Sequence, residues 1–83
     1  MKIYATHNVK GRGWVTVVDT TGVPKSALKI GILVHLGDHA WKLKGMEAHS
    51  GGGITDIAKR IGLILVPEGD APDVPECGKE LEL

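Results

Sequence analysis

Apolar and polar residues alternate along two adjoining segments that meet at Gly37 and Asp38. Alternation with a period of two residues is typical of a β-strand with one buried face. A glycine followed by an aspartate between two such segments favours a tight hairpin turn, because glycine adopts positive φ at little cost. Pairing Leu36 with His39 then separates an apolar face from a mainly polar one. The first face carries Ile32, Val34, Leu36, Trp41 and Leu43, and the second carries Leu33, His35, Ala40, Lys42 and Lys44.

Runs of β-branched and aliphatic residues predict further strands on both sides of this hairpin. They cover residues 2–9, 14–19, 61–66 and 78–83, the last as a short closing strand. The segment 61–66 is apolar throughout, which predicts a strand that is buried on both faces. Residues 54–60 have apolar positions at helical spacing and predict one or two helical turns. Several short strands with turn signals between them favour an all-β fold, a small antiparallel β-barrel.

The composition fits one small domain that spans residues 1–83. Aromatic residues make up only 4% of the chain, so aliphatic side chains must build most of the core. Basic and acidic residues number 10 each, and a net charge of zero exerts no long-range attraction on nucleic acid or membranes. A single cysteine, Cys77, fits a reducing compartment, and no signal peptide or membrane-spanning run is apparent. These features predict a cytoplasmic protein.

Gly45 interrupts the second strand of the hairpin and predicts a β-bulge. Such a bulge would turn Met46 and Ala48 inward and leave Glu47 and His49 together on the outside. A carboxylate beside a histidine could serve general acid–base chemistry, but no nucleophile or third orienting group accompanies this pair. The pattern therefore predicts a protein that is not an enzyme.

A metal centre is not expected either. His35 and His39 fall on opposite faces of the hairpin and cannot chelate one ion together, and Cys77 is isolated. The glycines at 51–53 are not followed by the lysine spacing of a phosphate-binding loop. No cofactor is predicted.

Five segments stand out along the chain, at residues 9–18, 28–31, 44–49, 59–65 and 73–81. Taken in this order, they resemble the second domain of translational GTPases, the β-barrel of elongation factor Tu and its relatives. Residues 9–18 are similar to that family's Gly-Arg-Gly start of a Thr/Val-rich strand, and residues 28–31 to its approach to the hairpin. Residues 44–49 resemble the family's Thr-Gly-Val-Glu-Met-His strand end. Residues 59–65 are similar to its Asp-Asn-Val-Gly-Leu-Leu-Leu strand, and residues 73–81 to the segment that ends in Arg-Gly-x-Val-Leu. The resemblance implies a Greek-key-type barrel that stands alone, without the GTP-binding domain.

The resemblance also implies where a partner would bind. In the family, the glutamate that corresponds to Glu47 helps form the pocket for the terminal adenosine of aminoacyl-tRNA, and His49 stands beside it. The chain has no Gly-x-x-x-x-Gly-Lys-[Ser/Thr] motif, so it is not expected to bind GTP by itself. The candidate binding residues for a protein or RNA partner are Glu47, His49, Arg12, Gly51, Gly52 and Gly53.

The leading hypothesis is a non-enzymatic binding or adaptor module that contacts a protein or RNA partner. One alternative is a structural or assembly subunit that forms a homo-oligomer through exposed strand edges. Another is a protein that binds an RNA 3′ end or the ribosome. Genomic neighbours would distinguish a role in translation from one in phage or particle assembly.

Overall fold

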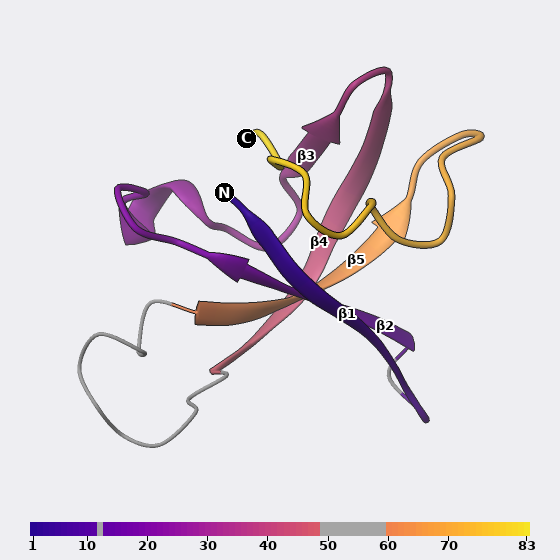
Figure 1. Ribbon diagram of the computed structural model, residues 1–83, viewed down its shortest axis with the longest axis horizontal. Coiled ribbons are helices and arrows are strands. Elements are labelled where there is room, and N and C mark those ends of the chain that lie inside the picture. Colours follow the sequence, from indigo (N-terminus) through magenta and orange to yellow (C-terminus); the bar gives the residue numbers. More distant parts are fainter. Residues whose placement is uncertain (12, 49–59) are drawn as a thin grey trace.

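The protein is an all-β domain built on one five-stranded sheet, as the sequence predicts. The computed structural model describes residues 1–11, 13–48 and 60–83. Neighbouring strands all run antiparallel in the order β1-β2-β5-β4-β3 (Figure 1). The elements are β1 (Ile3–Val9), β2 (Gly13–Asp19), the short 3-10 helix η1 (Lys25–Ala27), β3 (Leu33–Leu36), β4 (His39–Ala48) and β5 (Arg60–Pro67).

The strands predicted at 2–9, 14–19 and 61–66 correspond to β1, β2 and β5 and are confirmed. The helical turns predicted at 54–60 lie outside the described residues. The short helix η1 has no counterpart among the elements predicted from the sequence. A helix of this length adds one turn to the loop and leaves the fold class unchanged.

The β3–β4 hairpin has the register that its side chains predict. Leu36 pairs with His39 and Val34 with Trp41, and the backbone N–H of Leu43 donates to Ile32 O at 2.9 Å. Gly37 has a φ of 61° and is the residue of the turn with positive φ; Asp38 does not share that conformation. A glycine at the first central position with a negative φ at the second is typical of a type II′ turn. The turn therefore needs Gly37 and places no such demand on Asp38.

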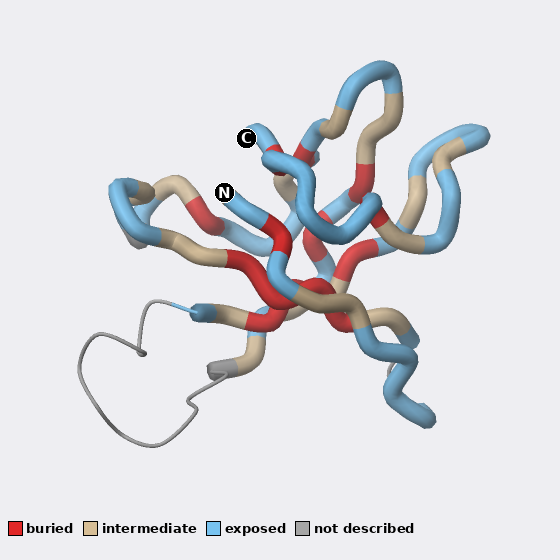
Figure 2. The backbone as a smooth tube through the Cα atoms, viewed as in Figure 1, coloured by how far each residue is buried: buried red, intermediate tan, exposed pale blue. Residues whose placement is uncertain are grey.

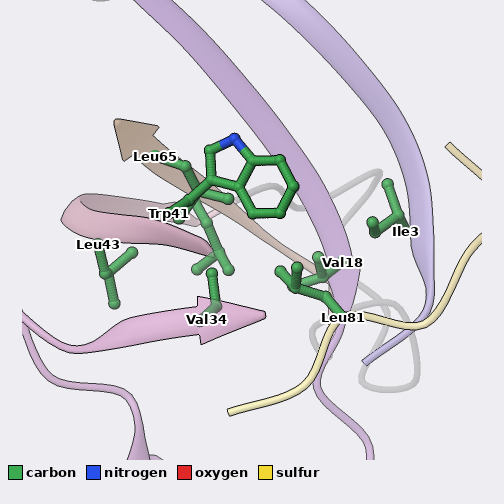
Figure 3. Close-up of a cluster of buried hydrophobic side chains, with 8 residues drawn as sticks. Ile3, Val18, Val34, Trp41, Leu43, Leu65 and Leu81 are labelled. Atoms are coloured by element: carbon green, nitrogen blue, oxygen red, sulfur yellow. The ribbon is translucent and has the colours of Figure 1, made fainter. Parts of the chain in front are cut away.

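The core lies where the strands cross, and Trp41 is its largest member. Its side chain is 0% exposed and packs among residues from β2, β3, β5 and the C-terminal segment (Figure 3). Most buried residues lie near the centre of the molecule, and most residues of the turns are exposed (Figure 2). The indole Nε1 donates to Pro72 O at 2.8 Å, which satisfies its polar atom. The buried cluster consists of Ile3, Val18, Val34, Trp41, Leu43, Leu63, Leu65 and Leu81.

The five-stranded sheet is open, and the C-terminal residues 78–82 lie across the gap between its two edges. On one side, Leu81 N–H donates to Met1 O at 2.7 Å and Gly78 N–H to Ile3 O at 2.9 Å. On the other side, His35 and Glu82 exchange two backbone bonds of 2.6 and 2.8 Å. The predicted closing strand is thus present as isolated bridges to β1 and β3. It completes a barrel-like arrangement that strand pairing alone does not close.

The predicted bulge lies in β4, and it shifts the register between Leu43 and Gly45. Beyond it Met46 pairs with the buried Leu63, so it faces the side of the sheet that the sequence predicts. Met46 is nonetheless 42% exposed. Glu47 lies on the opposite face, as the sequence predicts, and is half-buried there. Position on a face therefore does not decide burial at this end of β4.

Candidate functional site

Glu47 is the one predicted site residue that the described part of the chain contains. It lies on β4 opposite Gly62 of β5, and it already interacts with another group. A Cβ on Gly62 would lie 2.8 Å from Val15 Cγ1 and 3.8 Å from Glu47 Cβ, so the sheet is tightly packed beside this carboxylate. The other predicted residues, Arg12, His49, Gly51, Gly52 and Gly53, lie outside the described residues. A binding site around Glu47 therefore stays a prediction.

Asp19, at the end of β2, has a lowered pKa with a local structural cause. The hydroxyl and the backbone N–H of Thr21 both donate to Asp19 Oδ1, at 2.6 and 2.8 Å. These hydrogen bonds favour the ionised carboxylate and lower its pKa, with a smaller contribution from the charge of Arg60. The arrangement is that of an aspartate stabilising the turn that follows its strand. The carboxylate is therefore ionised at neutral pH and accepts the hydrogen bonds of this turn.

The histidines of the hairpin lie on opposite faces, as the sequence predicts. His35 pairs with Ala40 on the outer face, whereas His39 lies edge-on to Trp41 with the ring centroids 6.3 Å apart. His39 Nδ1 is 3.9 Å from Asp70 Oδ1. Within residues 1–11, 13–48 and 60–83, no three His, Cys, Asp or Glu side chains come together as metal ligands would.

Tyr4 is the centre of a small polar cluster on the outer surface of β1. The guanidinium of Arg60 lies 4.2 Å from the centroid of its ring and the Lys2 ammonium 5.7 Å from it. Asp19 is the register partner of Arg60 on the neighbouring strand. The thiol of Cys77 donates to Tyr4 O at 3.1 Å. One carboxylate accompanies the two cations, so the cluster has a formal charge of +1, and the contact between Arg60 and Tyr4 links β5 to β1.

The outer face of β3, β4 and β5 carries a feature that sequence reasoning missed. Lys42 pairs with Leu33 on one side and with Val66 on the other, so the three side chains form one row across the sheet. Leu33 and Val66 are each 40% exposed, and Lys42 is exposed as well. The expectation that residues 61–66 are buried on both faces is thus wrong at Val66. The exposed Lys44 follows on the same strand, and we call Leu33, Lys42, Lys44 and Val66 the basic-apolar face.

The segment that follows β5 has the opposite charge. Residues 68–76, which we call the acidic loop, contain four carboxylates and no lysine or arginine. All four are exposed. The loop is anchored at its start by Glu68 N–H, which donates to Ala40 O at 3.0 Å, and further on by the bond from Trp41 to Pro72. Its acidic residues are Glu68, Asp70, Asp73 and Glu76.

The fold and these surfaces define a small antiparallel all-β protein with a basic-apolar face and an acidic loop. Comparisons with protein families, with curated proteins and with solved structures found no match. The resemblance to the second domain of elongation factor Tu therefore stays a prediction. Among the described residues, no helix is long and apolar enough to cross a membrane.

Proposed function

We propose that this chain is a non-enzymatic binding module that uses its basic-apolar face to contact a protein partner. The observation that carries the proposal is the row formed by Leu33, Lys42 and Val66 on three adjacent strands. Single exposed apolar residues are common on protein surfaces and need no explanation. Here Leu33 and Val66 are the cross-strand neighbours of Lys42, so two exposed apolar side chains flank one lysine in a single row.

The chemistry of this face selects for carboxylates together with apolar side chains. The aliphatic stem of Lys42 extends the apolar surface between Leu33 and Val66, and its ammonium stays at the solvent end. Lys44, on the same strand, adds a second positive charge. A nucleic acid backbone is bound by many neutralising contacts, and the two lysines of this face are few for that. An acidic protein segment that also presents apolar groups fits better.

Titration followed by amide NMR shifts tests this function. The probes are a short peptide that combines Glu with Leu, a matched peptide that combines Lys with Leu, and an RNA with a 3′ CCA end. We expect the acidic peptide to shift Leu33, Lys42 and Val66, and the basic peptide to leave them unchanged. Equal shifts with both peptides, or no shift at the face, would contradict the proposal. Shifts confined to Glu47 with the RNA would favour the RNA-binding alternative instead.

The matched variants are Lys42→Gln on the face and Lys10→Gln in the turn after β1, both at exposed lysines. We expect Lys42→Gln to weaken binding of the acidic peptide several-fold and Lys10→Gln to leave it unchanged. Because one charge is removed in each variant, a general charge effect would weaken both equally. The comparison therefore separates a local surface from net charge.

A further inference from the structure

We infer that the partner of the basic-apolar face is the acidic loop of a second copy of this chain, so that copies associate head to tail. The inference rests on the proposed function, because it names the occupant of the same face. Its basis is the separation of charge along a chain whose total charge is zero. Residues 68–83 contain six of the ten acidic residues and only Lys79 among the basic ones. This end of the chain therefore carries a formal charge of −5, and residues 1–67 carry +5.

The middle of the acidic loop, around Pro72, lies on the other side of the sheet from the basic-apolar face of the same molecule. Successive residues of a strand point to opposite faces, so Trp41 points into the core and Lys42 points out. The acidic loop is attached on the inner side, because Trp41 Nε1 bonds to Pro72 O at 2.8 Å. The sheet thus lies between Pro72 and Lys42 of the same copy. Glu68, whose N–H donates to Ala40 O, instead continues β5 beside the face. The carboxylates offered to another copy are therefore those further along the loop, Asp73 and Glu76.

The acidic loop also offers the apolar groups that the face requires. Pro72 is exposed and Val74 is half-buried, and they lie on either side of the carboxylate of Asp73. Prolines at 72 and 75 restrict the backbone, and the bond to Trp41 fixes it further. A loop that is already ordered loses little conformational freedom when it binds. Leu33 and Val66 can therefore pack against Pro72 and Val74 while the lysines meet carboxylates.

When two copies bind through these two different surfaces, the dimer still has one free basic-apolar face and one free acidic loop. Such a heterologous contact continues into a ring or a filament. The zero net charge of the chain sets up no overall repulsion between copies. Because the attracting charges are exposed, added salt weakens the contact. We therefore expect association that increases with concentration and falls several-fold between low and high salt.

Sedimentation velocity on the full chain tests the inference with two complementary variants. Leu33→Glu places a carboxylate on the face, and Asp73→Asn with Glu76→Gln neutralises half of the carboxylates of the loop. Each variant alone should remain monomeric at concentrations where the unmodified chain associates. An equal mixture should form a one-to-one dimer and nothing larger, since one intact face and one intact loop remain. The control is Val9→Glu, the same kind of change at an apolar side chain on β1 that is 37% exposed, and it should leave association unchanged.

Several outcomes would overturn the inference. A chain that stays monomeric at low salt and high concentration does so directly, as does a variant mixture that fails to dimerise. If Val9→Glu abolishes association as fully as Leu33→Glu does, the inference also fails, because the result would show a general effect of surface charge. Thermal unfolding midpoints of all variants establish that each one is folded. If self-association is absent while the acidic peptide still shifts Leu33 and Val66, the binding module stands and its partner is another protein; if both are absent, the proposed function fails as well.

Discussion

The β3–β4 hairpin and the C-terminal residues 78–82 both contribute to the core, but they are held in different ways. The hairpin pairs residues that are neighbours in sequence, and its alternating side chains admit one register. Residues 78–82 pair with β1 and β3, which lie far away along the chain, through a few backbone bonds. Their one fully buried side chain is Leu81. Local pairing is therefore specified by the segment itself, whereas closure of the sheet depends on the rest of the fold.

This difference has an energetic consequence. A segment that buries a single apolar side chain opens at a lower free energy than a hairpin that buries several. The hairpin can open only by exposing Trp41 and Leu43, which are both fully buried. We therefore expect the two regions to respond differently to truncation of their buried side chains.

Truncation of Trp41 is expected to have the largest effect. Trp41→Ala removes the largest buried side chain and the bond to Pro72, and such changes cost about 3–5 kcal/mol of unfolding free energy. Because a domain of this size has a small margin of stability, we expect most of the chain to be unfolded. Denaturant titration followed by circular dichroism measures this. Trp14→Ala, at a half-buried indole on β2, is the control and should cost clearly less.

Truncation of Leu81 tests the closing segment in the same way. Leu81→Ala should cost about 2–4 kcal/mol, and amide hydrogen exchange should accelerate first at His35 and Glu82, which bond across the gap. The amides of the hairpin that pair β3 with β4 should keep their protection. Leu83→Ala, at a half-exposed leucine beyond the bridge, is the matched control and should change little. Equal acceleration throughout the sheet would show that the closing segment is not a separate unit.

The hairpin and the strands could be predicted because their signals are local. Alternation around Gly37 gives the register, and the isolated Gly45 gives the bulge. Residues 78–83 alternate and predict a strand, but nothing in that segment indicates which edges it joins. Such pairing depends on which strands the folded sheet leaves at its borders, and that is a property of the whole chain.

The basic-apolar face could not be predicted for the same reason. Leu33 falls on the outer side of the hairpin from alternation alone, but its row is completed by Val66, which adjoins Lys42 only because β5 pairs with β4. The apolar run that contains Val66 suggested burial on both sides, and the sheet leaves its outer end uncovered. The net charge of zero likewise conceals an uneven distribution, because residues 68–83 are acidic and residues 1–67 are basic. Net charge alone is thus a poor guide to what the surface attracts.

The smallest expected effect concerns Asp19, which belongs to neither of the two regions and provides a reference for both. Hydrogen bonds from Thr21 lower the pKa of this carboxyl below its ordinary value of 3.8. The unfolded chain therefore binds the proton at a higher pH than the folded chain does. The stabilisation is present above the ordinary value and is lost as the pH falls through the lower pKa of the folded state.

Asp19→Asn removes this titrating group, so the variant should lose less stability than the unmodified chain does on acidification below about pH 3.8. Denaturation midpoints measured at several pH values on both proteins give the comparison. Thr21→Val keeps the carboxyl but removes the donor that contributes most to the shift, and it should flatten the same part of the profile. Because Asp19 lies outside both the hairpin and residues 78–82, hydrogen exchange at His35 should not change in either variant. Identical acid profiles for all three proteins would mean that the Thr21 hydrogen bonds do not stabilise the turn.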